Sequence, residues 1–360
     1  MQGRGVAAAA RWGQGQSAAP PGAPGAPVEA APYPELALEL REGEKGEPVA
    51  DLQRRLADCG LTVAPDRTGE FGPGTCAAVQ RFQHRRGLRV DGLCGPQTWG
   101  ALVEAGFRVG DRFLYLRKPM LRGDDVAELQ HHLSALGFDT GRVDGILGEQ
   151  TAAAVREFQR NAGLPVDGIL GGTTLRELKR VMPREAGGEL VSAVRDRERL
   201  RHGPPTLLGR KIAIGEEGGL DVVATAIRRR LAFCGAVVVP LSHPSGSVQA
   251  SAANAARAEA YVGVRLDPFT SISRAAYYAG YNYESPGGRR LAELIQHLVA
   301  RALDVPPTGV EGMSIPILRE TRMPAVLCEF GPAVTVVQRA SSLAEAVVSA
   351  LTTWVATPID

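Results

Sequence analysis

Apolar residues recur at helical spacing in the first half of the chain, and the whole pattern occurs twice. The first predicted helix of each copy has apolar residues at positions i, i+3 and i+7, namely Val49, Leu52, Leu56 and then Val126, Leu129, Leu133. A second predicted helix in each copy has a buried stripe formed by Val79, Phe82 and by Val155, Phe158. The pattern therefore predicts two similar units, residues 47–106 and 124–182, each built from three short helices.

Small and polar residues mark the boundaries of these helices. Asp-Gly pairs such as Asp91-Gly92 predict tight turns, because glycine tolerates a positive φ. Threonine hydroxyls are expected to cap the second and third helices of each unit, at Thr75, Thr98, Thr151 and Thr174. A unit of about 60 residues has room only for a marginal core.

In the second half, short β-branched runs alternate with helical patterns. The predicted strands are Lys211–Ile214, Ala236–Leu241, Tyr261–Leu266 and Ala325–Phe330. Two helical faces lie between them, formed by Leu220, Val223, Ile227, Leu231 and by Leu291, Leu294, Leu298. This alternation predicts a mostly parallel sheet covered by helices on both faces. Ligands of such folds usually bind at the carboxyl ends of the strands, so candidate residues are sought there.

Local composition and the apolar pattern together predict five segments along the chain. Residues 1–44 form an Ala/Gly/Pro-rich tail that we expect to be disordered, 45–108 the first helical unit and 122–182 the second. Residues 183–209 form a linker with a short helix, and 210–358 the α/β domain. The apolar stretch at 6–10 is too short for the core of a signal peptide. We therefore expect a cytoplasmic protein, with an unusual export signal as the alternative.

Composition narrows the classes of function. The 41 basic and 39 acidic residues give a formal net charge of +2, which argues against a protein whose main role is nucleic-acid binding. The five cysteines are scattered and odd in number, which predicts free thiols rather than a disulfide framework. No apolar stretch approaches the length of a transmembrane helix.

The two helical units resemble a known family of peptidoglycan-binding domains. The residues that carry the resemblance in the first unit are Thr68-Gly69-Glu70-Phe71-Gly72, Thr75, Ala78-Val79, Phe82-Gln83, Gly87-Leu88, Asp91-Gly92, Gly95 and Thr98. The second unit repeats the pattern from Asp144 to Thr174. The resemblance implies binding of peptide-bearing cell-wall fragments. Most of these residues serve turns and core, so helical docking modules that have lost this ligand remain the alternative.

The second half resembles the zinc-dependent N-acetylmuramoyl-L-alanine amidases. The matching segments are Ile212-Ala213-Ile214, Gly218-Gly219, Ala253-Asn254, Arg289-Arg290-Leu291-Ala292, Ile317-Leu318-Arg319 and residues 324–331. The resemblance implies a zinc ion held by two histidines and a glutamate, with a second glutamate as general base. Here Glu329 stands at the position of the base, while Arg265 and Glu217 stand where the family has histidines. Glu216 or Asp221 would be the relic of the ligand glutamate.

The substitution at position 265 decides the predicted chemistry. A guanidinium is permanently protonated and cannot coordinate a metal, so we predict no metal and no cofactor. We expect Arg265 to pair with Glu329 and with Glu216 or Glu217, although a side chain directed to solvent is the alternative. An active zinc amidase would need an unrecognised ligand set, for example His243 with Glu217 and Glu329.

The combination of two such modules with an amidase-like domain carrying arginine at a ligand position resembles the CwlM-type proteins of actinobacteria. That resemblance implies a regulatory protein that recognises muropeptides or lipid-linked precursors and engages a cytoplasmic enzyme of cell-wall synthesis, with membrane or cell-wall association left open. The alternatives are an active amidase that hydrolyses the amide between N-acetylmuramic acid and L-alanine, and an exported wall anchor.

Overall fold

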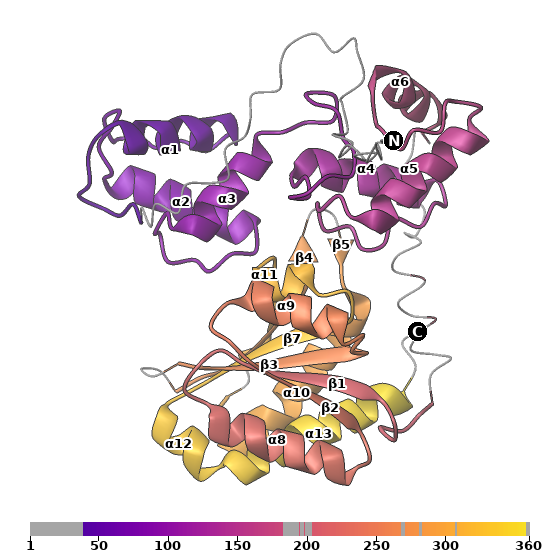
Figure 1. Ribbon diagram of the computed structural model, residues 1–360. Helices are drawn as coiled ribbons and strands as arrows, with labels where there is room; N and C mark the ends of the chain where they lie inside the picture. Colours follow the sequence, from indigo (N-terminus) through magenta and orange to yellow (C-terminus); the bar gives the residue numbers. More distant parts are fainter. Residues whose placement is uncertain are drawn as a thin grey trace, which may run out of the picture. The chain divides into compact units, whose positions relative to one another are not determined.

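The computed structural model describes residues 39–182, 194, 198, 204–267, 271–280, 283–306 and 308–357 (Figure 1). All of these residues lie in one unit of the chain, Leu38–Asp360. Most of the predicted tail at 1–44 and of the predicted linker at 183–209 falls outside the described residues. None of the helices in the described part of the chain combines the length and the hydropathy that a membrane span requires.

Each helical repeat has the three helices that the apolar pattern predicts. Repeat 1 contains α1 (Glu47–Asp58), α2 (Pro73–Arg85) and α3 (Pro96–Ala105), and repeat 2 contains α4 (Asp124–Ala135), α5 (Glu149–Asn161) and α6 (Gly172–Val181). The predicted stripes lie in two separate apolar cores, one per repeat. Gly92 and Gly168 have φ angles of 76° and 75°, so the Asp-Gly turns require glycine as expected.

The expected threonine caps are wrong. The N-caps are glycines, Gly72 and Gly148 for the second helices and Gly95 and Gly171 for the third, so the threonine hydroxyls do not cap these helix ends. The threonines lie inside the helices and are buried, so their hydroxyls need partners within the core. Buried glutamine amides supply them, Gln53 for Thr75, Gln83 for Thr98, Gln130 for Thr151 and Gln159 for Thr174.

The second half is an α/β domain built on a seven-stranded sheet. Its strands are β1 (Lys211–Glu216), β2 (Val237–Ser242), β3 (Ala260–Leu266), β4 (Ser273–Gly280), β5 (Tyr283–Glu284), β6 (Val310–Met313) and β7 (Ala325–Phe330). The strand order is β2-β1-β3-β7-β4-β5, with β6 also paired to β4. β2, β1, β3 and β7 are parallel neighbours, whereas β4 runs antiparallel to β7. The predicted mostly parallel sheet is confirmed.

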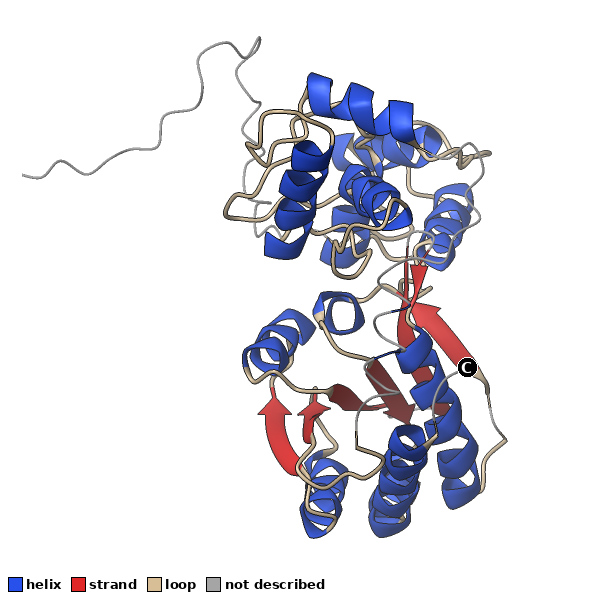
Figure 2. Ribbon diagram, turned by 90° about the vertical axis from the view of Figure 1, so that its right-hand side faces the viewer, coloured by secondary structure: helices blue, strands red, loops and turns tan. Residues whose placement is uncertain are grey.

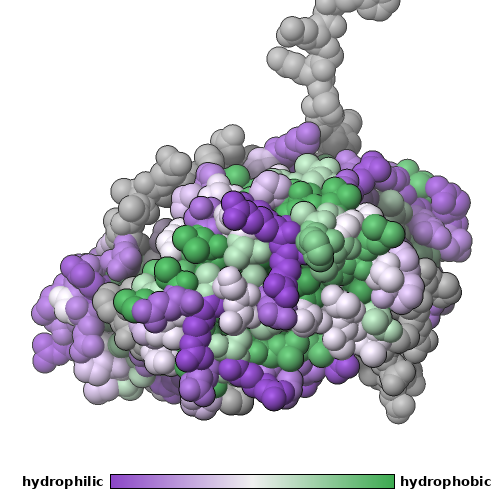
Figure 3. All heavy atoms as spheres, turned by 90° about the horizontal axis from the view of Figure 1, so that it is seen from below, coloured by the Kyte–Doolittle hydropathy of each residue, from purple (hydrophilic) through white to green (hydrophobic). Residues whose placement is uncertain are grey.

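Helices cover both faces of this sheet (Figures 1 and 2). They are α8 (Asp221–Phe233), α9 (Gly246–Ala255), α10 (Pro286–Leu303), α11 (Pro316–Glu320), α12 (Ala333–Gln338) and α13 (Ala340–Ala356). One face packs against α8, α10 and α13, and the other against α9 and α11. The face seen in Figure 3 shows hydrophobic surface interrupted by hydrophilic side chains. Phe233, at the end of α8, is 92% exposed.

Two local features differ from the sequence prediction. The core stripe of α10 runs through Leu291, Ile295 and Val299, while Leu294 and Leu298 lie at its flank and are only partly buried. Strand β4 was not predicted, because its sequence, Ser273–Gly280, lacks a β-branched run. The prediction of free thiols is confirmed, since all five cysteines are unpaired.

Candidate functional site

Charged side chains gather where the parallel strands end. The register of β3 and β7 sets Arg265 beside Glu329, and the antiparallel pairing of β4 with β7 sets Arg274 on the other side of the same glutamate. Directly paired residues of neighbouring strands lie on one face of the sheet. The backbone therefore places a carboxylate between two guanidinium groups at this edge.

Arg265 contacts two carboxylates. Its Nε and Nη2 each lie 3.2 Å from Oε1 of Glu329, and its Nη1 lies 3.4 Å from Oε2 of Glu217 in the loop after β1. The side chain of Arg265 is 28% exposed, whereas those of Glu217 and Glu329 are 14% and 11% exposed. The guanidinium therefore bridges two largely buried carboxylates, and charge-assisted contacts of this kind are among the stronger ones in proteins.

Arg274 and Glu311 extend the cluster toward solvent. The Arg274 guanidinium lies 3.5 Å from Oε2 of Glu329 and 3.5 Å from Oε1 of Glu311 on β6. Sequence reasoning missed both residues, because neither β4 nor β6 had been predicted. An arginine facing Glu329 could have been suspected only with the antiparallel pairing of β4 in hand.

Burial governs the titration of Glu217. Loss of water raises the pKa of this carboxyl above its ordinary value, and the nearby Arg265 opposes that shift while the carboxylates of Glu329 and Glu216 add to it. Because the pKa is raised in the folded state, the charged form of Glu217 lowers the free energy of unfolding. The stability contributed by this group is present at low pH and is lost as the pH rises through the raised pKa.

The Glu217→Gln variant should therefore be more stable than the wild type at pH 7. The amide keeps the shape of the side chain but has no charge to desolvate. The advantage should shrink as the pH falls below the ordinary value of 4.5, where Glu217 is protonated in both states. Urea unfolding at pH 7 and pH 4 measures this, with the exposed Glu311→Gln as a control that changes little. A less stable variant at pH 7 would mean that the attraction of Arg265 outweighs burial.

The other predicted site residues have local structural roles. Glu216 directs one carboxylate oxygen to the amides of Gly218 and Leu220, at 2.7 and 3.0 Å, and the other to the hydroxyl of Ser242. The structure thus brings Glu217, not Glu216, to Arg265. Asp221 pairs with Arg228 at 3.0 Å.

His243 makes a hydrogen bond within its own loop. It is exposed, and its Nδ1 accepts a hydrogen bond from the amide of Ser245 at 2.9 Å. Its ring is therefore held to the loop that leads into α9. The arrangement does not join it with Glu217 and Glu329 in a metal site.

The cluster does not supply what a zinc ion needs. A catalytic zinc takes three protein donors with free lone pairs and one water. Among the described residues, no group of three or more histidine, cysteine, aspartate or glutamate side chains could hold a metal ion. The Arg265 guanidinium bridges the two nearest carboxylates and would repel a cation there.

Comparison with protein families identifies the repeats. Residues 45–102 and 122–178 each match the model described as a putative peptidoglycan binding domain. The chain is also similar to the zinc D-Ala-D-Ala carboxypeptidase of Streptomyces albus G, with 47% identity over 68 residues. That match covers 18% of this chain and 26% of the relative, so it concerns one module.

A longer similarity spans both halves of the chain. The N-acetylmuramoyl-L-alanine amidase CwlM of Mycobacterium tuberculosis is 34% identical over 332 residues, which cover 81% of each protein. The amidase CwlL of Bacillus licheniformis is 33% identical over 164 residues, which cover 40% of this chain and 46% of CwlL. Among solved structures, the amidase Ami1 of Mycobacterium smegmatis aligns with 42% of this chain and 98% of its own, with 14% identity and a TM-score of 0.37.

Proposed function

The chain belongs to the CwlM family of N-acetylmuramoyl-L-alanine amidase relatives, and on that basis we propose that it is a peptidoglycan-binding regulatory protein whose amidase-like domain is catalytically silent. Peptidoglycan binding follows from the two matched modules. The charge at the strand ends, where Arg265 stands between Glu217 and Glu329, supports catalytic silence. That contact is the observation on which the proposal rests.

The chemistry of the reaction explains why this substitution matters. Hydrolysis of an amide needs an activated water and a positive centre that stabilises the oxyanion, and a bound zinc supplies both. A guanidinium supplies charge, but it cannot lower the pKa of a bound water by coordination. Glu329 at the position of a general base is in turn held by two arginines. A base engaged in this way has fewer lone pairs left for a water molecule.

Two measurements test the proposal together. The purified protein should contain less than stoichiometric zinc, and it should release no peptide from muropeptides when zinc is added in excess. CwlL of Bacillus licheniformis would serve as the positive control, because this relative is named as an amidase. Stoichiometric zinc together with hydrolysis would refute catalytic silence and favour the active amidase, a reading that the name of the CwlM relative supports.

We further propose that the protein acts in the cytoplasm, where it engages an enzyme of cell-wall synthesis and senses a muropeptide or a lipid-linked precursor. Family membership supports this role. Cell fractionation with a tagged protein tests the location, and crosslinking followed by capture tests the partner. Recovery of the protein mainly in the wall fraction would favour a wall anchor instead.

A further inference from the structure

The two repeats carry the same pair of loops. In repeat 1, Lys45 and Glu70 form an isolated β-bridge, and in repeat 2 Arg122 and Ile146 form the equivalent one. The adjoining backbone bonds also correspond, because Gly46 donates to Gly69 as Gly123 donates to Gly145, at 2.9 and 3.1 Å. We call the loops at 43–46 and 65–73 the Lys45 face, and those at 120–123 and 141–149 the Arg122 face.

The Arg122 face is occupied by the α/β domain. The segment 318–321, at the end of α11, lies against it, and Arg142 reaches from the face to the carbonyl oxygens of Leu318, at 3.3 Å, and of Thr321. Only 6% of Arg142 is exposed. Its guanidinium also lies 4.5 Å from the ring centre of Tyr278 on β4. Ala127 and Val143 of repeat 2 belong to the same apolar cluster as α11, so the contact is a packed one.

This occupant shows which chemistry the face accepts. Arg319 is the cation of the segment, and it donates to the carbonyl oxygens of Asp144, at 2.6 Å, and Gly145, at 3.5 Å. Glu320 is the carboxylate of the segment, and it pairs with Arg122 at 2.8 Å. The face therefore takes a stretch of peptide that presents a positive group, a negative group and main-chain carbonyls.

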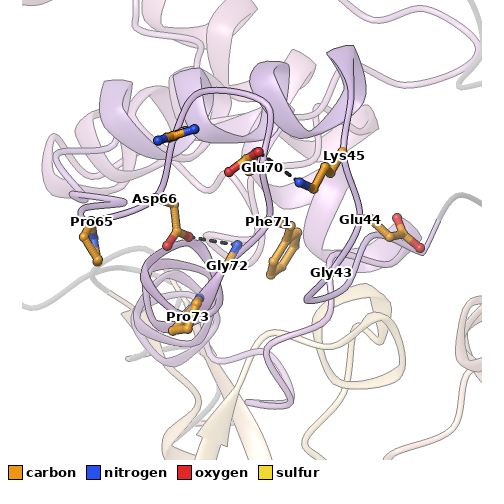
Figure 4. A pocket seen from close by; sticks show the side chains of 10 residues that line it. Gly43, Glu44, Lys45, Pro65, Asp66, Glu70, Phe71, Gly72 and Pro73 are labelled. Carbon is orange, nitrogen blue, oxygen red and sulfur yellow. Dashed lines mark hydrogen bonds and ion pairs between the residues drawn. The ribbon is translucent and has the colours of Figure 1, made fainter.

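Among the residues that the structure describes, only residues of repeat 1 line the Lys45 face. It forms a cavity of about 350 Å³ whose lining includes Lys45, Asp66, Glu70 and Phe71 (Figure 4). Lys45 and Glu70 point toward one another at 3.0 Å, with side chains 69% and 41% exposed. An exposed ion pair contributes little to stability, so a ligand carboxylate can replace Glu70 at Lys45 with small loss.

Asp66 shapes the cavity. Its carboxylate accepts hydrogen bonds from the amides of Gly72, Gly74 and Thr75, at 3.0, 3.1 and 2.6 Å. These three bonds fix the loop against the start of α2. Lys45 and Glu70 remain for a ligand as a positive and a negative group side by side, and Glu44 and Arg67 also line the cavity.

We propose that the Lys45 face binds the stem peptide of a peptidoglycan fragment, and that repeat 2 is closed to this ligand because the α/β domain fills its Arg122 face. The ligand is peptide rather than glycan, since the occupant of the matching face is peptide. A stem peptide that contains a diamino acid carries both an ammonium and a carboxylate, which suits the Lys45 and Glu70 pair. The inference rests on the proposed peptidoglycan binding and assigns it to one repeat.

Calorimetry on the full chain tests the assignment with three probes, a disaccharide-tetrapeptide, the free tetrapeptide and the disaccharide alone. We expect one ligand per chain for both peptide-bearing probes and no binding of the disaccharide. Lys45→Glu should weaken binding by about tenfold or more, as expected for loss of a charge-assisted contact. The matched Arg122→Glu should not weaken it. Lys45→Ala should also weaken binding, and an unchanged circular dichroism spectrum of this variant would show that the loss does not come from misfolding.

A second variant tests whether repeat 2 is closed. Arg319→Ala removes the contacts to Asp144 and Gly145 and also the ion pair with Glu104 at 2.7 Å, so it should loosen the docked segment and raise the stoichiometry toward two ligands per chain. Two ligands on the wild type, or binding that Lys45→Glu leaves intact, would overturn the assignment while peptidoglycan binding stands. Binding of the disaccharide alone would overturn the peptide specificity. If no probe binds the wild type, peptidoglycan binding itself fails, and the assignment fails with it.

Discussion

Replacing Gln83 by leucine should abolish the cooperative folding of repeat 1. The side-chain amide of Gln83 is buried and lies 2.8 Å from the carboxylate of Asp91, 2.9 Å from the carbonyl of Leu93 and 3.1 Å from the hydroxyl of Thr98. Its oxygen accepts from the amides of Asp91 and Gly92. Leucine fills the space but leaves these groups without their partner, at a cost of about 1–3 kcal/mol for each one that stays buried.

The size of the repeat makes this loss severe. A module of about 60 residues has a free energy of unfolding of about 3–9 kcal/mol. Two unsatisfied groups therefore remove most of it. Urea unfolding followed through Trp99, which packs against the core of repeat 1, would show the loss of its transition. Calorimetry with the disaccharide-tetrapeptide would show whether muropeptide binding is lost in the same variant.

Gln159→Leu in repeat 2 is the matched control. Gln159 makes the corresponding contacts with Asp167, Ile169 and Thr174. Both repeats contact the α/β domain, repeat 1 through Glu104 and Gly87, but repeat 2 also buries Arg142 against it and shares an apolar cluster with α11. The same substitution should therefore leave repeat 2 folded and only lower the denaturant concentration at which it unfolds. If Gln83→Leu unfolds within about 0.5 kcal/mol of the wild type, the glutamine braces contribute far less than their geometry implies.

The repeats were predictable because their pattern is local. Helical spacing, Asp-Gly turns and a motif present twice fix the three helices of each repeat before any tertiary contact forms. The prediction of threonine caps was wrong because a threonine near a helix start can either cap the helix or lie buried in its first turn, and the local sequence looks the same in both cases. A partner such as Gln53, which is 22 residues from Thr75, decides between them. The signal was present, since Gln53 and Gln130 occupy matching positions in the two repeats.

The candidate site was predictable only in part, for a physical reason. The parallel strands could be inferred from β-branched runs, so Arg265 and Glu329 could be assigned to neighbouring strand ends. Glu217 and Glu216 are adjacent in sequence, and only the conformation of their loop decides which one faces Arg265. The docking of repeat 2 depends on Arg142 meeting Leu318, 176 residues away, and no local pattern reports such a contact.

Arg265→Ala should lower the free energy of unfolding of the α/β domain by about 2 kcal/mol. Hydrogen bonds to charged groups contribute about 1.5–3 kcal/mol, and the partial exposure of Arg265 favours the lower part of that range. The variant also leaves the carboxylates of Glu217 and Glu329 without the cation between them. Burial already raises the pKa of Glu217, and loss of Arg265 should raise it further. Carboxyl NMR titration would register this second effect independently of stability.

Arg274→Ala is the matched control for that variant. Its guanidinium contacts the same Glu329 but at 3.5 Å, and its side chain is 38% exposed, so its removal should cost less than about 0.5 kcal/mol. The double variant Arg265→Ala/Glu329→Gln should lose less stability than the sum of the single variants, by about 1 kcal/mol, because the two residues act through one contact. Additive losses, or an Arg265→Ala protein as stable as the wild type, would mean that the guanidinium does not hold the carboxylates. The argument that it replaces a metal would then lose its physical basis.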